Sequence, residues 1–157
     1  MGIPLNFFVD SYTPDDEYQH LEKISKTHGS QGFESSFDKL PVRGRVPSGP
    51  SYPETVGFCE TAIRLARLQV NGQEKVIRLV IKCADFITHA SFPSSLHEAG
   101  SRDFKFTVVE LHLDSQGVGT GVVVNPAKLW FDDRGQLQVL PFDPANVIKL
   151  AGVRQVK

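Results

Sequence analysis

The sequence predicts a mainly β fold, in which a small β-barrel follows an N-terminal helix and a long loop rich in glycine, serine and proline. Two observations support this prediction. About six short segments of alternating, β-branched or aromatic residues lie between turn signals after the first third of the chain. One segment near the N-terminus has the capping and charge pattern of a helix instead. With 157 residues, the chain is expected to form one domain, 1–157, with its own core.

The helix is predicted over residues 13–28. Thr13 is a suitable cap, a proline follows at the first helical position, and three acidic residues lie at the positive end of the helix dipole. Gly29 is expected to end the helix. Residues 29–57 are then predicted to form a long loop, because glycine, serine and proline recur there and little regular structure fits.

Apolar patterning predicts two strands over residues 58–70 and 75–87. They are joined at Asn71-Gly72, a strong signal for a tight hairpin turn. The pattern changes phase at Ala66-Arg67, which favours a β-bulge there. Further strands are expected at 103–113, 117–124, 127–131 and 137–142.

The predicted barrel lies within residues 42–140. Both faces of the strand at 75–83 carry apolar side chains, so its sheet is expected to be covered on the second face as well. The early helix or a partner would supply that cover. The C-terminal stretch 144–157 suits either a helix or a strand.

Composition excludes several classes of protein. The net charge of −1 creates no overall field that would draw the chain to nucleic acid or to a membrane. No apolar run approaches the ~20 residues of a membrane span, and no secretion signal is visible. A cytoplasmic protein is therefore expected, and Cys59 and Cys83 are expected to be buried free thiols.

Catalytic and metal-binding motifs are missing from the sequence. No nucleophile, base and acid can be assembled into a recognisable arrangement, so the chain is predicted not to be an enzyme and to need no cofactor. A zinc site would need several converging ligands, and the spacing of His89, His97 and His112 fits no such pattern. The glycine-rich segment 117–121 lacks the lysine and the helix of a phosphate loop.

Charge is distributed unevenly along the chain. Residues 1–38 carry two cations and seven anions, whereas residues 39–82 carry eight cations and three anions. The excess of positive charge therefore coincides with the predicted hairpin and the loop before it.

The hairpin cations call for a compensating anion. Arg64 is expected to lie near Arg78, and like charges opposite each other destabilise a sheet by up to ~1 kcal/mol. Glu60 and Glu74 would serve if this is an ordinary solvated face. A phosphate backbone would also serve, because the arginine fork matches phosphate oxygens.

Aromatic residues offer a second kind of contact. Trp130 and Phe131 are adjacent, so one of them faces outward unless both faces are covered, and Trp130 is predicted to be the exposed one. An exposed ring can stack on a nucleotide base. Phe104 and Phe106 are in phase on one strand and are predicted to belong to the core.

The order of these features resembles the OB fold of single-stranded-DNA-binding proteins. The segments that carry the resemblance are "VRGRV", "GFCETAIRLARLQVNGQEKVIRLVIKCAD" and "GTGVVVNPAKLWFDDRGQLQV". The resemblance implies a five-stranded barrel with a cationic, aromatic binding face. It implies phosphate contacts from Arg64, Arg67, Arg78 and Lys82, and a stacking ring from Trp130. Two cations of the first strand, Arg43 and Arg45, complete the predicted nucleic-acid-binding surface.

Two functions remain open at this point. The first is a non-enzymatic protein that binds nucleic acid, with single-stranded DNA preferred, through the cationic sheet face; its affinity would fall steeply with salt. The alternative is a protein-interaction module, such as a small inhibitor or adaptor of the type encoded by viruses or mobile elements. It would use the loop 29–57 and the aromatic residues to bind a protein partner. A homo-oligomer is compatible with either.

Overall fold

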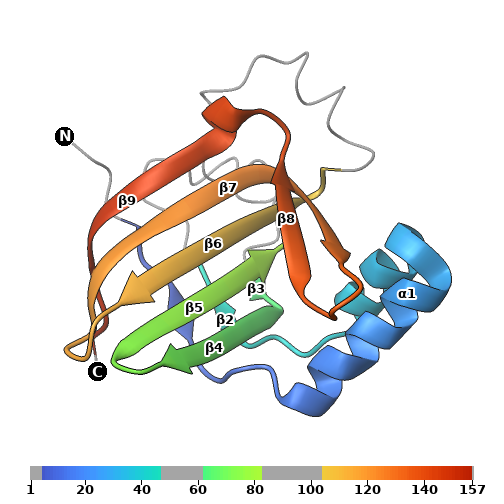
Figure 1. The fold of residues 1–157 in the computed structure, drawn as a ribbon, viewed down its shortest axis with the longest axis horizontal. Helices are drawn as coiled ribbons and strands as arrows, with labels where there is room; N and C mark the ends of the chain where they lie inside the picture. The colour runs from blue at the N-terminus through green and yellow to red at the C-terminus, as the bar shows by residue number, and fades with distance from the viewer. Residues whose placement is uncertain (1–4, 47–61, 83–103, 157) are drawn as a thin grey trace.

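The computed structural model describes residues 5–46, 62–82 and 104–156 of the chain (Figure 1). In these residues the fold is mainly β, with one helix and two sheets. The predicted fold class, a β protein with an N-terminal helix, is thereby confirmed.

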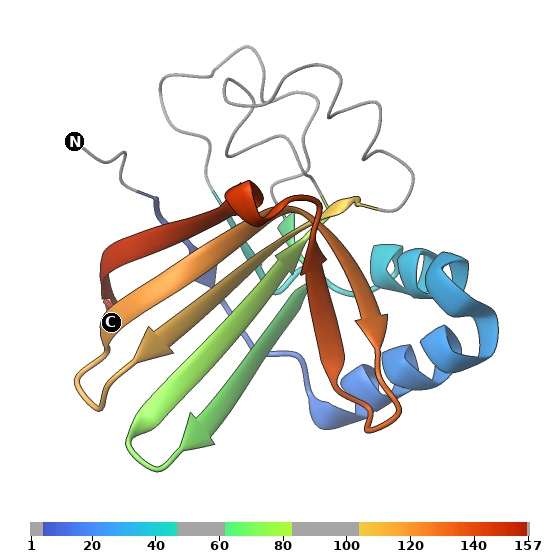
Figure 2. The ribbon, with the colours of Figure 1, turned by 45° about the horizontal axis from the view of Figure 1, so that its top comes forward.

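The main sheet is an antiparallel meander. Its strands are β4 (Leu65–Asn71), β5 (Glu74–Ile81), β6 (Phe106–Leu113), β7 (Val118–Phe131), β8 (Leu137–Pro141) and β9 (Val147–Arg154). Both β8 and β9 pair with the side of β7 that faces away from β6: Ala127 pairs with Phe106 on one side and with Pro141 on the other. A short 3-10 helix, η2 (Pro144–Asn146), separates these two strands (Figure 2).

Strand β7 differs from the prediction in its length. The sequence suggested separate strands at 117–124 and 127–131, but a single strand of 14 residues runs through both. Its first half pairs with β9 and its second half with β8, so one long strand organises the C-terminal part of the sheet. In the C-terminal stretch, whose sequence suits either a helix or a strand, residues 147–154 form β9.

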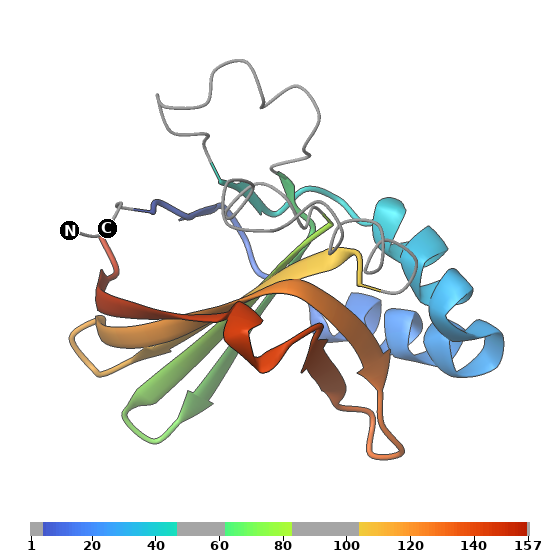
Figure 3. The same ribbon diagram turned by 90° about the horizontal axis from the view of Figure 1, so that it is seen from above.

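A second, small sheet lies on one face of the main sheet. It consists of β1 (Phe8–Val9), β2 (Gly44–Arg45) and β3 (Ala62–Ile63). Gly44 is needed here because a Cβ at this position would overlap the backbone carbonyl of Phe8. Figure 3 shows β1 and β2 on one side of the main sheet and α1 beside the end of β7 that curls toward the other side.

The OB-like barrel predicted for residues 42–140 is not confirmed. The described strands form two separate sheets and no closed barrel. The chain passes from β3 in the small sheet to β4 in the main sheet at Arg64, which belongs to neither strand. The phase change predicted as a bulge at Ala66-Arg67 therefore reflects a change of sheet, and β4 pairs with β5 in unbroken register from Leu65 to Asn71.

Helix α1 (Asp15–Asp38) is longer than the predicted helix 13–28. Gly29 has non-helical backbone angles, φ 70° and ψ −155°, but it kinks the helix instead of ending it. The chain resumes the helix because Phe33 and Phe37, one turn apart, pack into the core of the sheet. Residues 30–38 are therefore helical, and the prediction of a loop over 29–57 is wrong for that part.

The start of the helix also differs from the prediction. Pro14 occupies the N-cap position, and no side chain caps the helix. Thr13 instead joins the helix to the sheet, because its backbone N–H donates to the carbonyl of Ala66 (2.7 Å) and its hydroxyl accepts from the Ala66 N–H (3.0 Å).

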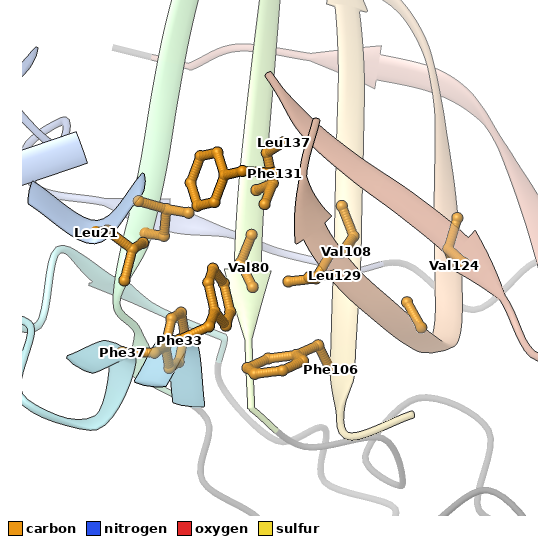
Figure 4. Close-up of a cluster of buried hydrophobic side chains, with 12 residues drawn as sticks. Leu21, Phe33, Phe37, Val80, Phe106, Val108, Val124, Leu129, Phe131 and Leu137 are labelled. Carbon is orange, nitrogen blue, oxygen red and sulfur yellow. The ribbon is translucent and has the colours of Figure 1, made fainter. Parts of the chain in front are cut away.

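Two hydrophobic clusters cover the two faces of the main sheet. The first lies between α1 and the sheet, where Phe33 packs edge-on against Phe106 with ring centroids 5.5 Å apart (Figure 4). The second lies between the main sheet and the small sheet, around Ile63 and Leu79. The expectation that both faces of the strand at 75–83 are covered is confirmed for its described part, with the helix on one side and β1–β3 on the other.

Candidate functional site

The register of the β4–β5 hairpin decides which cations meet. The turn predicted at Asn71-Gly72 is present: Asn71 pairs with Glu74, and Gly72 has a positive φ of 65°. In this register Arg67, and not Arg64, stands opposite Arg78. The predicted Arg64–Arg78 neighbourhood is therefore wrong, because the two turn residues are Gly72 and Gln73, and the unbroken register from the Asn71–Glu74 pair brings Arg67 to Arg78.

Arg78 is held on the helix-facing side of the sheet. Its Nη2 and Nε donate to Oε2 of Glu110 at 2.7 and 3.1 Å, and its Nη1 donates to the carbonyl of Leu137 at 2.9 Å. Burial raises the pKa of Glu110, but the hydrogen bonds from Arg78 and His112 outweigh it and lower that pKa below its ordinary value. The Arg78 guanidinium thus has a carboxylate partner within the sheet.

Arg67 is bound by the start of the helix. Its Nη1 donates to the carbonyl of Thr13 and its Nη2 to Oδ1 of Asp15, both at 2.8 Å. The guanidinium also lies over the ring of Tyr18, 4.2 Å from the centroid. Three groups of one short segment therefore engage this arginine.

Lys82 and Lys105 bind the second half of the helix. The Nζ of Lys82 lies 2.8 Å from Asp38 and 3.0 Å from Glu34, and the Nζ of Lys105 lies 2.8 Å from Glu34. The hydrogen bond from Lys105, with that from Lys82, lowers the pKa of Glu34. Burial lowers the pKa of Lys82, but its bonds to Asp38 and Glu34 raise it overall. These ion pairs fasten the segment after the Gly29 kink to the sheet.

The remaining predicted cations have partners of different kinds. Arg43 donates from Nη2 to both carboxylate oxygens of Glu17 at 2.8 Å, while its buried Nε has no hydrogen-bond partner among the described residues. Arg64 donates to the carbonyl of Leu40 at 2.6 Å. Arg45 is exposed and lies over the ring of Phe8, 4.8 Å from its centroid.

The uneven distribution of charge is therefore largely compensated within the chain. Carboxylates of α1 pair with cations of the sheet and of the segment before β2; these carboxylates are Asp15, Glu17, Glu34 and Asp38. The compensating anions suggested by the sequence were different: Glu74 binds His112 instead, and Glu60 lies outside the described residues. The acidic N-terminal segment is a visible signal for this pairing, although the sequence pattern alone does not identify its partners.

His112 lies between two carboxylates on the same sheet face. Its Nδ1 is 2.8 Å from Oε1 of Glu74, and its Nε2 is 2.8 Å from Oε1 of Glu110. Because a carboxylate only accepts hydrogen bonds, both contacts are hydrogen bonds at the same time only when each ring nitrogen carries a proton. The hydrogen bonds to Glu74 and Glu110 raise the pKa of His112. The sequence pattern raised this residue only as a candidate metal ligand.

Trp130 lies on the outer face of the hairpin formed by β7 and β8, opposite the helix. Its side chain is 39% exposed, whereas Phe131 is 9% exposed and belongs to the core, as predicted. Trp130 pairs with Gln138, and Lys128 pairs with Leu140, which is 45% exposed. Trp130 and Leu140 are thus diagonal neighbours on one face and form a small exposed apolar patch, called here the Trp130 face.

A shallow depression of about 350 Å³ lies at the tips of the β4–β5 and β6–β7 hairpins. Its lining includes Glu74 and His112, which already bind each other. No group of three or more histidine, cysteine or acidic residues in the described ranges is arranged to hold a metal ion. Cys59, Cys83 and the loop histidines at 89 and 97 lie outside those ranges.

Comparisons of the chain with protein-family models, with curated proteins and with solved structures give no significant match. The resemblance to OB folds therefore stays a prediction from the sequence pattern. Within the described residues, α1 lacks the length of apolar sequence that a membrane-spanning helix needs.

Proposed function

We propose that this chain is a non-enzymatic binding module that engages a protein partner through the Trp130 face. The observation that carries the proposal is the contrast between two surfaces. Arg64, Arg67, Arg78 and Lys82 are bound by carboxylates or by backbone carbonyls, whereas Trp130 and Leu140 present apolar side chains to solvent.

The helix-covered face of the sheet is poorly suited to a nucleic-acid strand. A phosphate could replace the exposed carboxylate of Asp15 at Arg67, but full access to that guanidinium would require α1 to move, because it also donates to the carbonyl of Thr13 and lies over the ring of Tyr18. This helix buries Leu21, Phe33 and Phe37, each at most 1% exposed. Exposing one such side chain costs about 1.5–3 kcal/mol, so displacement of the helix would remove much of the stability of a domain of this size.

Hydrogen bonds order the β7–β8 turn beside the Trp130 face, which favours the use of this face as an anchor. Oδ1 of Asp132 accepts hydrogen bonds from the backbone N–H groups of Arg134 and Gln136, both at 2.9 Å, and Oδ2 accepts from the side chain of Gln138 at 2.8 Å. The turn and the residue that pairs with Trp130 are thus bonded together. An ordered backbone at the anchor reduces the conformational entropy lost on binding, and tryptophan is enriched among the residues that dominate interface energies.

The first experiment compares partner capture by three immobilised proteins: the wild type, Trp130→Ala, and Val118→Ala, which truncates a side chain of similar exposure (42%) elsewhere. Each is incubated with an extract of the encoding organism at low salt and at about 500 mM salt, because apolar contacts survive salt and exposed charge contacts are screened. The proposal expects a protein retained by the wild type and V118A at both salt concentrations and lost by W130A. Equal retention by all three proteins would refute it.

Binding of single-stranded nucleic acid is the second candidate, and the exposed ring of Trp130 also supports it. Stacking on one base contributes about 1–3 kcal/mol, so W130A should weaken binding of a labelled oligo-dT at least fivefold in fluorescence anisotropy. If the sheet cations also contact phosphates, Arg64→Ala and Arg78→Ala should each reduce the salt slope by about one. Absence of binding at low salt would dismiss this candidate, because electrostatic binding is strongest there.

A further inference from the structure

The two edges of the main sheet differ in how they are protected. At the β8–β9 edge, Pro141 ends β8, and Ala151 and Gly152 of β9 stand opposite the single residue Thr120, which makes a bulge with a positive φ at Gly152. Lys149 adds an exposed charge to that edge. Proline, bulges and charges are the usual devices that prevent a sheet edge from pairing with another chain.

The β4 edge lacks these devices. From Leu68 to Asn71 every residue is exposed, none is charged, none is proline, and the register with β5 is regular. Leu68 and Val70 point to the same face of the sheet and are 36% and 61% exposed. In the described part of the chain, β4 pairs with β5 alone.

The direction of the unpaired backbone groups follows from the contact with Thr13. Both the N–H and the carbonyl of Ala66 bond to Thr13, so these groups point away from β5. In an antiparallel strand this direction repeats at every second residue. The N–H and carbonyl groups of Leu68 and Val70 therefore also point outward, beyond the place where Thr13 covers the edge.

We infer that β4 pairs with β4 of a second copy of this chain in antiparallel register, with a two-fold axis at Gln69. In this register Leu68 meets Val70 of the second copy, and the symmetric pair repeats the contact. These two positions carry the outward backbone groups, so each pair exchanges two hydrogen bonds. The main sheet then continues from one copy into the other.

The choice of a second copy rests on self-complementarity. At the axis, Gln69 of one copy faces Gln69 of the other, and their two side-chain amides can hydrogen-bond to each other. Arg67 faces the uncharged Asn71 of the second copy, so no like charges are opposed. The apolar pair of Leu68 and Val70 adds about 0.2–1 kcal/mol at each of its two occurrences. An isologous contact requires one patch to fit itself, and this segment does so. Because the segment is short, the dimer is reversible and depends on concentration.

A cysteine at the axis tests the register directly. Residues that face each other without hydrogen bonds have Cα atoms about 4.5 Å apart, within the range of a disulfide. In a background with Cys59→Ser and Cys83→Ser, Gln69→Cys should form a covalent dimer under mild oxidation. Ser115→Cys, exposed in the β6–β7 turn, is the matched control and should stay monomeric. Failure of Q69C to cross-link, or equal cross-linking of S115C, would overturn the inference.

Sedimentation velocity over a 100-fold range of concentration tests the dimer without cysteines. The wild type should shift from the 17.4 kDa monomer toward twice that mass. Val70→Lys should weaken association at least tenfold by placing two like charges diagonally across the axis, while Val147→Lys on the opposite edge should leave it unchanged. Loss of the dimer in V147K alone, or a wild type that stays monomeric throughout, would refute it. W130A should dimerise normally, which separates this inference from the proposed function.

Discussion

Arg67 and Arg78 stand directly opposite each other on β4 and β5, and each guanidinium is bound by a different carboxylate. Asp15 at the start of the helix binds Arg67, and Glu110 on β6 binds Arg78. Two like charges are thus accommodated side by side because anions reach them from different elements. The pair connects the helix, the hairpin and the centre of the sheet.

Loss of the anion at Arg78 should destabilise the fold. Glu110→Gln keeps the size of the side chain but leaves Arg78 and His112 without their shared carboxylate, and the free energy of unfolding should fall by about 1–3 kcal/mol. Urea denaturation at pH 7 measures this. Asp133→Asn, which alters an exposed carboxylate in the β7–β8 turn, serves as the control and should change stability by less than about 0.5 kcal/mol. An effect of E110Q no larger than that of D133N would contradict the prediction.

Stability should depend on pH through His112. The carboxylates of Glu74 and Glu110 raise the pKa of His112 above its ordinary value of 6.5. The folded state therefore binds this proton more tightly than the unfolded state, and the stabilisation is fully present below the unfolded pKa. It is lost as the pH rises through the folded pKa.

The difference in free energy of unfolding between the wild type and His112→Gln, measured from pH 5.5 to pH 9, isolates this contribution from the other histidines. The advantage of the wild type should shrink as the pH rises. A constant difference across the range would argue against an imidazolium bound by the two glutamates.

The kink in α1 should depend on glycine at position 29. Its angles, φ 70° and ψ −155°, lie in a region that is essentially restricted to glycine. Gly29→Ala should therefore lower the free energy of unfolding by about 1–3 kcal/mol, although nothing lies within 4 Å of the position a Cβ would take. Ser30→Ala, an exposed neighbour, is the control. If G29A were neutral in thermal unfolding, the helix would not need this backbone conformation.

The second half of α1 should contribute strongly to stability through Phe33. This side chain is 1% exposed and contacts the rings of Phe37, Phe106 and Phe131. Phe33→Ala should cost about 3–5 kcal/mol in urea denaturation. Phe8→Ala, which truncates an exposed ring beneath Arg45, should cost less than about 1 kcal/mol. Similar costs for the two variants would mean that the segment after the kink is not anchored as described.

Local signals predicted the parts of the fold that depend on neighbouring residues. Asn71-Gly72 marks the hairpin turn because the turn needs a positive φ, which glycine adopts without strain. The adjacent Trp130 and Phe131 point to opposite faces because side chains alternate along a strand. The same local reasoning failed at Gly29, where glycine usually ends a helix, because the buried contacts of Phe33 and Phe37 lie on distant strands.

The sequence by itself determined that this is a mainly β protein with an N-terminal helix, and that its acidic and basic residues lie in separate segments. Only the tertiary structure decided that the strands divide into two sheets and that carboxylates of α1 bind Arg43, Arg67 and Lys82. Strand pairing and ion pairing join residues tens of positions apart. Which residues pair is determined by the packing of the helix on the sheet. The periodicity of apolar residues along the chain contains no information about these partners.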